Sequence, residues 1–377
     1  MENIKKNFGF GCMRLPMKDG EVDIPETNRM VDAFLEAGFN YFDTAHGYID
    51  GKSEKALKEC LTSRYPRDRY ILTNKLTNFY FKREEDIRPF LESQLEACGV
   101  EYFDIYLMHA QTAEVFQYFK SCRAYETAFQ LKEEGKVRHV GISFHDTAEV
   151  LEQILSEYPQ IEVVQLQFNY LDYEDPAVQG RRCYEVCRKF GKPIIVMEPV
   201  KGGTLVNLPE MAAKELHDLH GGSPASYAIR YAAGFPGMMM VLSGMSNLEQ
   251  MQDNLSYMKD FRPLNEEEHA AVKKVVYDDK SVTMDELIKA LDANFEGYEV
   301  VQQLLINAPK YGNNDPYADN IGKQIDHFVC EYLAQNPGVH GESFSMRVVP
   351  VTFHIPSGKV TGATPSGWYP LFAPGVT

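Results

Sequence analysis

The hydrophobic positions of the chain gather in short runs, rich in Val, Ile, Phe and Tyr, that alternate with amphipathic segments. Most runs begin about 25 to 35 residues after the previous one, which is long enough for a strand, a loop and a crossover helix. Several are apolar along their whole length, as expected of parallel strands covered on both faces. Eight strands are therefore predicted, at 9–13, 40–45, 70–76, 103–109, 138–144, 163–169, 193–199 and 239–244.

The segments between these runs have the spacing of helices. Residues 87–99 carry apolar side chains on one helical face and end at Gly99, a favourable C-cap. Residues 146–158 begin with Asp146, a favourable N-cap. Eight such βα units match a (β/α)8 TIM barrel, which typically needs about 250 residues. The alternative is a doubly wound open sheet, which would place a Gly-rich turn directly after its first strand, and the sequence has no such turn with the right spacing.

Polar residues follow the predicted strands at their carboxyl ends. Each one alone has a structural explanation, such as capping a turn or forming a hydrogen bond in the core. Their gathering at one end of the barrel favours a functional site, because that end carries the chemistry of TIM-barrel enzymes. The residues are Asp43, Lys75, His109, Ser143, Gln165 and Asn169.

Composition excludes several classes of protein. The 377 residues are 44% hydrophobic and 24% charged, which is typical of a globular domain rather than a disordered chain. The formal net charge of −16 makes nucleic acids and anionic membranes poor partners. No apolar stretch is long enough for a membrane span, and the first residues lack the apolar core of a signal peptide. Seven cysteines are sparse and odd in number, so we expect a reducing cytoplasm.

Residues 1–276 resemble the aldo/keto reductase family. GISFHD, QLQFNYLD and MEPVKGG resemble more narrowly the bacterial branch that usually carries a C-terminal iron–sulfur segment. The resemblance implies hydride transfer between NAD(P)H and a small aldehyde or ketone. The motifs that carry the family resemblance are GFGCMRLP, YFDTAHGY, ILTNKL, DIYLMHA, GISFHD and GMSNLEQMQDN.

By that resemblance, four residues form a catalytic tetrad. Tyr48 would donate a proton to the carbonyl oxygen as negative charge develops there. Lys75 would lower the pKa of the Tyr48 phenol, and Asp43 would hold Lys75 charged and aimed. His109 would orient and polarise the carbonyl by a hydrogen bond.

The resemblance also implies a cofactor site. Ser143 and Gln165 would bind the nicotinamide amide, and Gly202 and Gly203 would leave backbone N–H groups open to a pyrophosphate. The helix that starts at Asn247 would favour the adenosine phosphate. The remaining predicted contacts are Gly11, Cys12, Met13, Asp43, Met197, Ser243, Gly244, Met245, Gln250 and Asn254.

Two departures from the family pattern concern this cofactor. Met197 stands where many relatives have a Tyr that stacks on the nicotinamide ring. Gly244 and Gln250 stand where NADP-preferring relatives have a Lys and an Arg, counting back from Asn254. The usual cofactor preference of the family still favours NADPH, with NADH as the alternative.

The last hundred residues follow a different pattern. Residues 281–377 resemble an internal fragment of the glycyl radical enzymes, of the choline-lyase and diol-dehydratase type. The iron–sulfur cysteines of the bacterial branch are absent, because Cys330 is the only cysteine after Cys187, so no cluster is expected. His217 and His220 lack a third ligand, and no metal site is expected. A barrel at 1–278 and a loosely packed, mainly helical extension at 279–377 are predicted, with helices at 283–294, 298–307 and 316–335 and an unpaired strand at 347–355.

Three questions stay open at this point. The junction near Asp278–Ser281 is compatible with a natural fusion, a deliberate joining or an artefact. The barrel is a reductase or, alternatively, a cofactor-binding module that senses redox state with little turnover; a subunit that aids radical chemistry has the lowest weight. The sequence leaves the carbonyl substrate and the oligomeric state undetermined.

Overall fold

Eight parallel strands close into a barrel. The computed structural model describes residues 3–208, 210–278, 344–348 and 351–355. Around the barrel the strand order is β1-β10-β9-β8-β7-β6-β5-β4, and every neighbouring pair is parallel. The strands are β1 Phe8–Gly11, β4 Tyr41–Asp43, β5 Ile71–Leu76, β6 Phe103–Gln111, β7 Val137–Phe144, β8 Val163–Gln167, β9 Ile194–Met197 and β10 Met238–Ser243.

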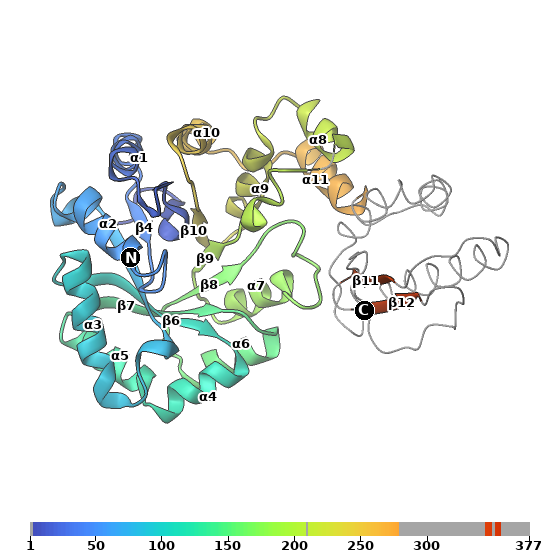
Figure 1. Cartoon of the computed structure of the whole chain (residues 1–377). Helices are drawn as coiled ribbons and strands as arrows, with labels where there is room; N and C mark the ends of the chain where they lie inside the picture. Colours follow the sequence, from blue (N-terminus) through green and yellow to red (C-terminus); the bar gives the residue numbers. More distant parts are fainter. Residues whose placement is uncertain (1–2, 209, 279–343, 349–350, 356–377) are drawn as a thin grey trace. The chain divides into compact units, whose positions relative to one another are not determined.

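Helices lie outside these strands (Figure 1). Short elements extend the connections: a hairpin of β2 Met17–Lys18 and β3 Glu21–Val22, 3-10 turns at Cys12–Arg14, Arg67–Arg69, Asn78–Tyr80 and Lys201–Gly203, and a π-helical turn at Lys58–Thr62. The helices are α1 Ile24–Glu36, α2 Lys52–Leu57, α3 Glu84–Cys98, α4 Ala113–Ser121, α5 Ala124–Glu133, α6 Ala148–Glu157, α7 Gly180–Lys189, α8 Glu210–His217, α9 Pro224–Ala233, α10 Leu248–Met258 and α11 Glu266–Asp278.

The predicted barrel is confirmed, and all eight predicted strands are present in it. Helix α3 ends as expected at Gly99, which adopts the left-handed conformation at φ 67°. The predicted N-cap of α6 was wrong, because Thr147 and not Asp146 occupies that position. The Asp146 carboxylate accepts hydrogen bonds from the backbone N–H groups of Ala113 and Thr147, so it fastens the loops after β6 and β7 instead.

The barrel interior is a packed hydrophobic core rather than a channel. A Cβ at Gly141 would lie 2.5 Å from the backbone oxygen of Val163, so only glycine lets β7 approach β8 this closely. Hydrophobic side chains from six strands fill the interior, as is usual for this fold. They are Tyr41, Ile71, Ile105, Leu107, Val163, Ile195, Met240 and Leu242.

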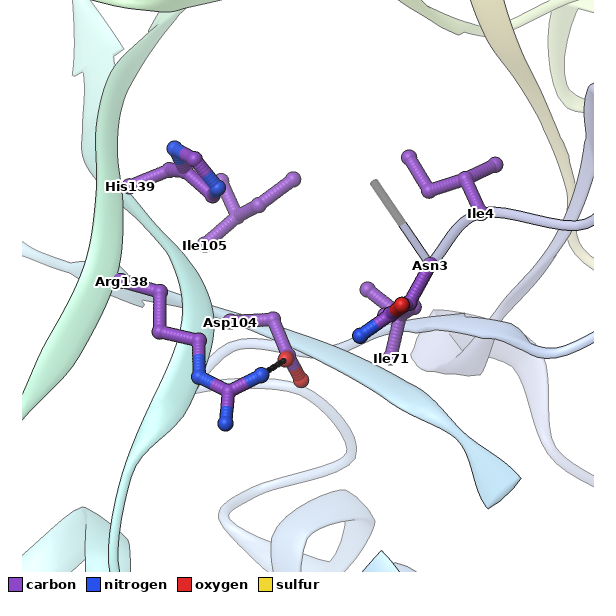
Figure 2. A pocket seen from close by; sticks show the side chains of 7 residues that line it. All are labelled: Asn3, Ile4, Ile71, Asp104, Ile105, Arg138 and His139. Atoms are coloured by element: carbon purple, nitrogen blue, oxygen red, sulfur yellow. Dashed lines mark ion pairs between the residues drawn. The ribbon is translucent and has the colours of Figure 1, made fainter. Parts of the chain in front are cut away.

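A small hollow lies at the amino-terminal face of the barrel, opposite the ends where the predicted site residues gather (Figure 2). An ion pair of 3.5 Å joins Arg138 to Asp104 at its edge. Residues at this face of a TIM barrel usually contribute to stability rather than to catalysis. The hollow is lined by Asn3, Ile4, Ile71, Asp104, Ile105, Arg138 and His139.

The chain divides into two units, one of residues 1–173 and 178–271 and one of residues 174–177 and 272–377. In the second, β11 Phe344–Val348 pairs antiparallel with β12 Val351–Ile355. The prediction of an unpaired strand at 347–355 was therefore wrong, because the segment contributes to a hairpin whose two strands pair with each other. The helices predicted at 283–294, 298–307 and 316–335 lie outside the described residues. In the described part of the chain, no helix has the length and apolar character needed to cross a membrane.

Candidate active site

Four polar side chains meet at the carboxyl ends of β4, β5 and β6. Asp43 is the last residue of β4, Lys75 lies in β5 and His109 lies in β6. Tyr48 comes from the loop after β4, and its ring centroid lies 6.3 Å from that of His109. The structure thus brings together all four residues that the sequence proposes as a tetrad.

Lys75 stands at the centre of this group and is fully buried. Its ammonium donates to Asp43 Oδ1 at 2.5 Å, to the backbone oxygen of Thr44 at 2.9 Å and to Tyr48 Oη at 3.1 Å. These acceptors use all three of its N–H groups. Burial alone would lower the pKa of Lys75, but the Asp43 carboxylate and the Tyr48 phenol outweigh it and raise that pKa above its ordinary value. The ammonium therefore stays charged and is held in one orientation.

Two opposing effects act on the pKa of Tyr48. Burial raises it, and the nearby Lys75 ammonium lowers it by less, so the pKa lies above the ordinary value of 10.0. Lys75 thus lowers the pKa of Tyr48 as predicted, but the net direction is upward, because removing the phenolate from water costs more than one cation restores. At neutral pH Tyr48 is protonated, with its Oη 3.1 Å from Lys75 Nζ.

His109 is neutral and oriented by a residue that the sequence reading missed. Burial and the charge of Lys75 lower its pKa from 6.5 to about 3. Thr77 Oγ1 lies 2.7 Å from His109 Nδ1. The other ring nitrogen, Nε2, has no hydrogen bond to a described residue. When the Thr77 hydroxyl donates to Nδ1, the ring proton lies on Nε2, where a carbonyl oxygen could accept it. Thr77 lies two residues beyond Lys75 on the same chain segment. In the sequence, only that spacing could have indicated its contact with His109.

A buried polar network supports Lys75 from behind, and the sequence reading missed this as well. Glu54 in α2 is only 1% exposed and accepts hydrogen bonds from Asn74 at 2.8 Å and from Gln94 at 3.3 Å. Its other oxygen lies 2.8 Å from His46 Nδ1. Gln94 also donates to the backbone oxygen of Lys75 at 3.1 Å. A satisfied network of this kind fixes the backbone that carries the ammonium.

Gln165 and Ser143 lie beside the tetrad, on β8 and β7. Gln165 Nε2 donates to Asp43 Oδ2 at 3.1 Å, which leaves Oε1 without a hydrogen bond to a described residue. Ser143 Oγ accepts from the backbone N–H of Ala110 at 2.8 Å, which leaves its hydroxyl proton free to donate. The two residues therefore present one acceptor and one donor, as a carboxamide would require.

The loop after β9 is tightly constrained. Four residues of this short loop have positive φ values: 56° at Glu198, 47° at Lys201, 62° at Gly202 and 102° at Gly203. The Lys201 ammonium forms an ion pair with the fully buried Asp172, which Asn169 Nδ2 also contacts at 2.7 Å. Left-handed non-glycine residues persist only where their surroundings hold them, and they gather at functional sites.

The two glycines of this loop differ from the expectation that both would offer free backbone N–H groups. The Gly203 N–H donates to the Val200 oxygen at 3.0 Å, so that part of the prediction was wrong. The 3-10 turn of residues 201–203 uses this amide internally. The Gly202 N–H donates to no described residue and remains open.

The segment after β10 leads into α10, whose N-cap is Asn247 as predicted. The Asn247 side chain accepts from the Gln250 N–H at 2.8 Å, and Gln250 Oε1 accepts from the Ser246 N–H at 2.8 Å. Asn254 donates to Ser243 Oγ at 2.7 Å, and both residues are buried. The side chains of Ser243, Gln250 and Asn254 thus shape the loop by bonding within it.

The end of β1 completes the rim of the site. Gly11 pairs with Asp43 of β4 and packs against the backbone of Ser243 and Gly244. Cys12 is fully buried, and burial raises the pKa of its thiol, so it is an unreactive packing residue in this state. Met13 is 54% exposed. Of the remaining predicted contacts, Met197 at the end of β9 is half-buried, and Met245 after β10 is buried.

The aldo/keto reductase family model matches residues 7–277 of the chain. The chain belongs to the aldo/keto reductase family.

Solved structures show the same barrel as this aldo/keto reductase. An aldo-keto reductase from Bacillus halodurans in its holo form has a TM-score of 0.58 at 24% identity, with 72% of this chain and 92% of that chain covered. An aldo-keto reductase from Klebsiella pneumoniae in complex with NADPH has a TM-score of 0.59 at 19% identity, with 72% and 95% covered. At these identities the shared property is the fold.

Curated relatives match the two parts of this aldo/keto reductase separately. The NADH-specific methylglyoxal reductase of Escherichia coli is 27% identical over 195 residues, which is 46% of this chain and 57% of that protein. A pyruvate formate lyase-like family model matches residues 270–358. The isethionate sulfite-lyase of Bilophila wadsworthia is 52% identical over 105 residues, so the chain spans 13% of the length of that relative. Among the described residues, no group of three or more His, Cys, Asp or Glu side chains could hold a metal ion.

Proposed function

We propose that this protein is an NAD(P)H-dependent oxidoreductase that reduces an aldehyde or ketone, with Tyr48 as the proton donor. The observation that carries the proposal is the position of the buried Lys75 ammonium between Asp43 and Tyr48, at 2.5 Å and 3.1 Å. A protein that only binds a cofactor has no need of a proton donor held in this way. Membership of the aldo/keto reductase family supports the same reaction class.

Each residue has one role in this proposal. The bound nicotinamide supplies the hydride. Tyr48 donates its phenolic proton to the carbonyl oxygen as charge develops there, and the neighbouring Lys75 stabilises the phenolate that remains. Asp43 keeps the ammonium charged and aimed. The neutral His109 donates from Nε2 to the same carbonyl oxygen and so orients the substrate.

The groups around the tetrad fit a nicotinamide dinucleotide. Gln165 Oε1 and the Ser143 hydroxyl offer the acceptor and the donor that a carboxamide requires, and the open N–H of Gly202 could meet a phosphate oxygen. The K. pneumoniae relative is described in complex with NADPH, and the E. coli relative is described as NADH-specific. Family habit favours NADPH for this chain, with the substrate a small carbonyl compound.

The variant Tyr48→Phe tests the proposal. We expect it to abolish NADPH- and NADH-dependent reduction across a panel of aldehydes and ketones while calorimetric cofactor binding stays close to that of wild type. Wild-type protein that binds cofactor but turns over no carbonyl in the panel would instead support the redox-sensing module. Full activity in Tyr48→Phe would rule out Tyr48 as the donor.

We further propose that the reductase occupies residues 1–278 and that residues 279–377 form a separate, loosely packed extension related to glycyl radical enzymes. The separate family matches at 7–277 and 270–358 support this division. Limited proteolysis of the whole chain should cut first after residue 278 and leave a fragment that retains carbonyl reductase activity. An extension as resistant as the barrel would contradict loose packing.

A further inference from the structure

Arg14 is a cation beside the active site to which the tetrad and the predicted cofactor contacts give no role. It is the last residue of the 3-10 turn that follows β1, two residues beyond Cys12. Its side chain is exposed. Among the described residues, its guanidinium has no hydrogen bond and no ion pair. The exposed Arg88, by contrast, is paired with the Glu134 carboxylate.

The backbone of Arg14 is fixed to the segment that leads into α10. Its backbone oxygen accepts a hydrogen bond from Ser246 Oγ at 2.9 Å. The stem of its side chain lies against Gly244, where an added Cβ would be 3.4 Å from Arg14 Cδ and 3.7 Å from Arg14 Cγ. The side chain therefore crosses the loop after β10 instead of extending directly into solvent.

The guanidinium ends beside the loop after β9. A Cβ added at Gly202 would lie 3.4 Å from Arg14 Nη2. The Gly202 N–H is the backbone amide of this loop that stays open, and Gly202 has a φ of 62°. The Glu198 carboxylate is the nearest acidic group, 3.8 Å from the same Cβ position, yet it forms no ion pair with Arg14. A free cation and a free N–H group thus lie side by side between two loops.

We infer that Arg14 binds the diphosphate of the nicotinamide cofactor, together with the Gly202 backbone N–H. A guanidinium beside an open amide N–H suits phosphate oxygens, because both donate charge-assisted hydrogen bonds to them. The position lies between the loops that follow β1, β9 and β10, at the same end of the barrel as Asp43 and Gln165. The assignment rests on the proposed function, since it needs a dinucleotide in this site.

The position of the Arg14 guanidinium fits the diphosphate of the cofactor better than the adenosine 2′-phosphate. The first turn of α10 already holds the Glu26 carboxylate, which accepts from the Leu248 N–H at 2.8 Å. A second anion at that turn would meet this carboxylate. Arg14 instead points away from α10, across Gly244 and toward Gly202. Because NADH and NADPH share the diphosphate, Arg14 should contribute equally to the binding of both.

The test compares Arg14→Met with wild type by calorimetric titration of the full chain with NADH, NADPH and ADP-ribose. ADP-ribose carries the diphosphate but has neither a nicotinamide nor a 2′-phosphate. Methionine keeps most of the apolar stem against Gly244 and removes the charge. We expect Kd to rise about 10- to 100-fold for all three ligands, as for the loss of a charged hydrogen bond. The control Arg88→Met removes an exposed arginine that is bound to Glu134 and should leave each Kd unchanged.

The outcomes separate this assignment from the proposed function. Equal weakening of all three ligands in Arg14→Met, with an unchanged melting temperature, supports the diphosphate contact. Unchanged Kd values overturn it while leaving the reductase proposal intact. Weakening of NADPH alone also overturns it, since the contact would then be with the 2′-phosphate. Wild-type protein that binds none of the three ligands contradicts the proposed function itself.

Discussion

The hydroxyl oxygen of Thr77 lies 2.7 Å from Nδ1 of His109, where the ends of β5 and β6 come together. Burial lowers the pKa of the imidazole to about 3, so the ring is neutral at neutral pH. A neutral imidazole carries one proton, and the partner of one ring nitrogen decides which nitrogen holds it. When the Thr77 hydroxyl donates to Nδ1, His109 carries its proton on Nε2 and can donate it to a carbonyl oxygen.

Thr77→Val should impair reduction without impairing cofactor binding. The valine keeps the shape but cannot donate to Nδ1, so the population with the proton on Nε2 falls. We expect kcat/KM for carbonyl reduction to drop about 3- to 10-fold, which corresponds to one net hydrogen bond. Thr77→Ser should retain most of the activity. Nitrogen-15 NMR of His109 would report the change of tautomer directly, and an unchanged tautomer in Thr77→Val would contradict this role.

The rate of reduction should be independent of pH across the neutral range. Reduction needs Tyr48 protonated, a condition that holds below its pKa and is lost as pH rises through it. Burial raises that pKa above 10.0, and His109 does not gain a proton until the pH nears 3. We therefore expect kcat/KM to be level between about pH 5 and 9, where neither group titrates. A decline centred near pH 7 would mean that the phenol ionises far more easily than its burial implies.

Much of this site can be read from the sequence, because a closed parallel barrel brings all strand ends to one face. Once eight evenly spaced strands are recognised, Asp43, Lys75 and His109 must converge whatever the loops do. Arg14 and Thr77 could not be assigned in this way. Their roles depend on the path of the segments that follow β1 and β5, and loop paths carry no periodic signal.

The ionisation of the site shows a second limit of prediction from the sequence. The cation beside Tyr48 is visible in the sequence, but the burial that outweighs it results from packing by many residues. The same holds for the loop after β9, where an internal turn uses the Gly203 N–H. The sequence indicates which groups are present, and the three-dimensional packing decides which of them remain free.

Lys75→Met should destabilise the fold as well as abolish activity. The substitution leaves the Asp43 carboxylate buried without its cation, although Gln165 still donates to it. Removing one partner of a buried ion pair typically costs about 3–5 kcal/mol in the free energy of unfolding. Urea denaturation followed by circular dichroism would measure this loss. The double variant Asp43→Asn/Lys75→Met should regain most of the stability and none of the activity, which separates the two roles of the pair.

Glu162 should contribute to stability in a pH-dependent manner. His139 Nδ1 lies 2.7 Å and Lys132 Nζ 2.5 Å from its two oxygens, and although burial alone would raise its pKa, these partners lower it from 4.5 to about 2. A carboxyl whose pKa is depressed by folding stabilises the native state above its unfolded pKa and loses that contribution as pH falls through the folded value. The free energy of unfolding should thus fall between pH 4.5 and 2 in wild type and fall less steeply in Glu162→Gln. Glu133→Gln, at an exposed glutamate without an ion pair among the described residues, should behave as wild type.

Glu26 should set the preference between NADH and NADPH. Its carboxylate accepts from the Leu248 N–H at 2.8 Å and pairs with Arg29, so a negative charge already occupies the first turn of α10. A 2′-phosphate at that turn would be repelled, whereas a 2′-hydroxyl would not. We expect Glu26→Gln, which keeps the acceptor and removes the charge, to tighten NADPH binding about 3- to 10-fold and to leave the Kd for NADH within twofold of wild type, the size of a screened surface interaction. Glu36→Gln, at the far end of α1, is the matched control. If calorimetry gives the same ratio of the two Kd values in wild type and Glu26→Gln, the adenosine end of the cofactor lies elsewhere. The Glu26 carboxylate would then not oppose the preference of the family for NADPH.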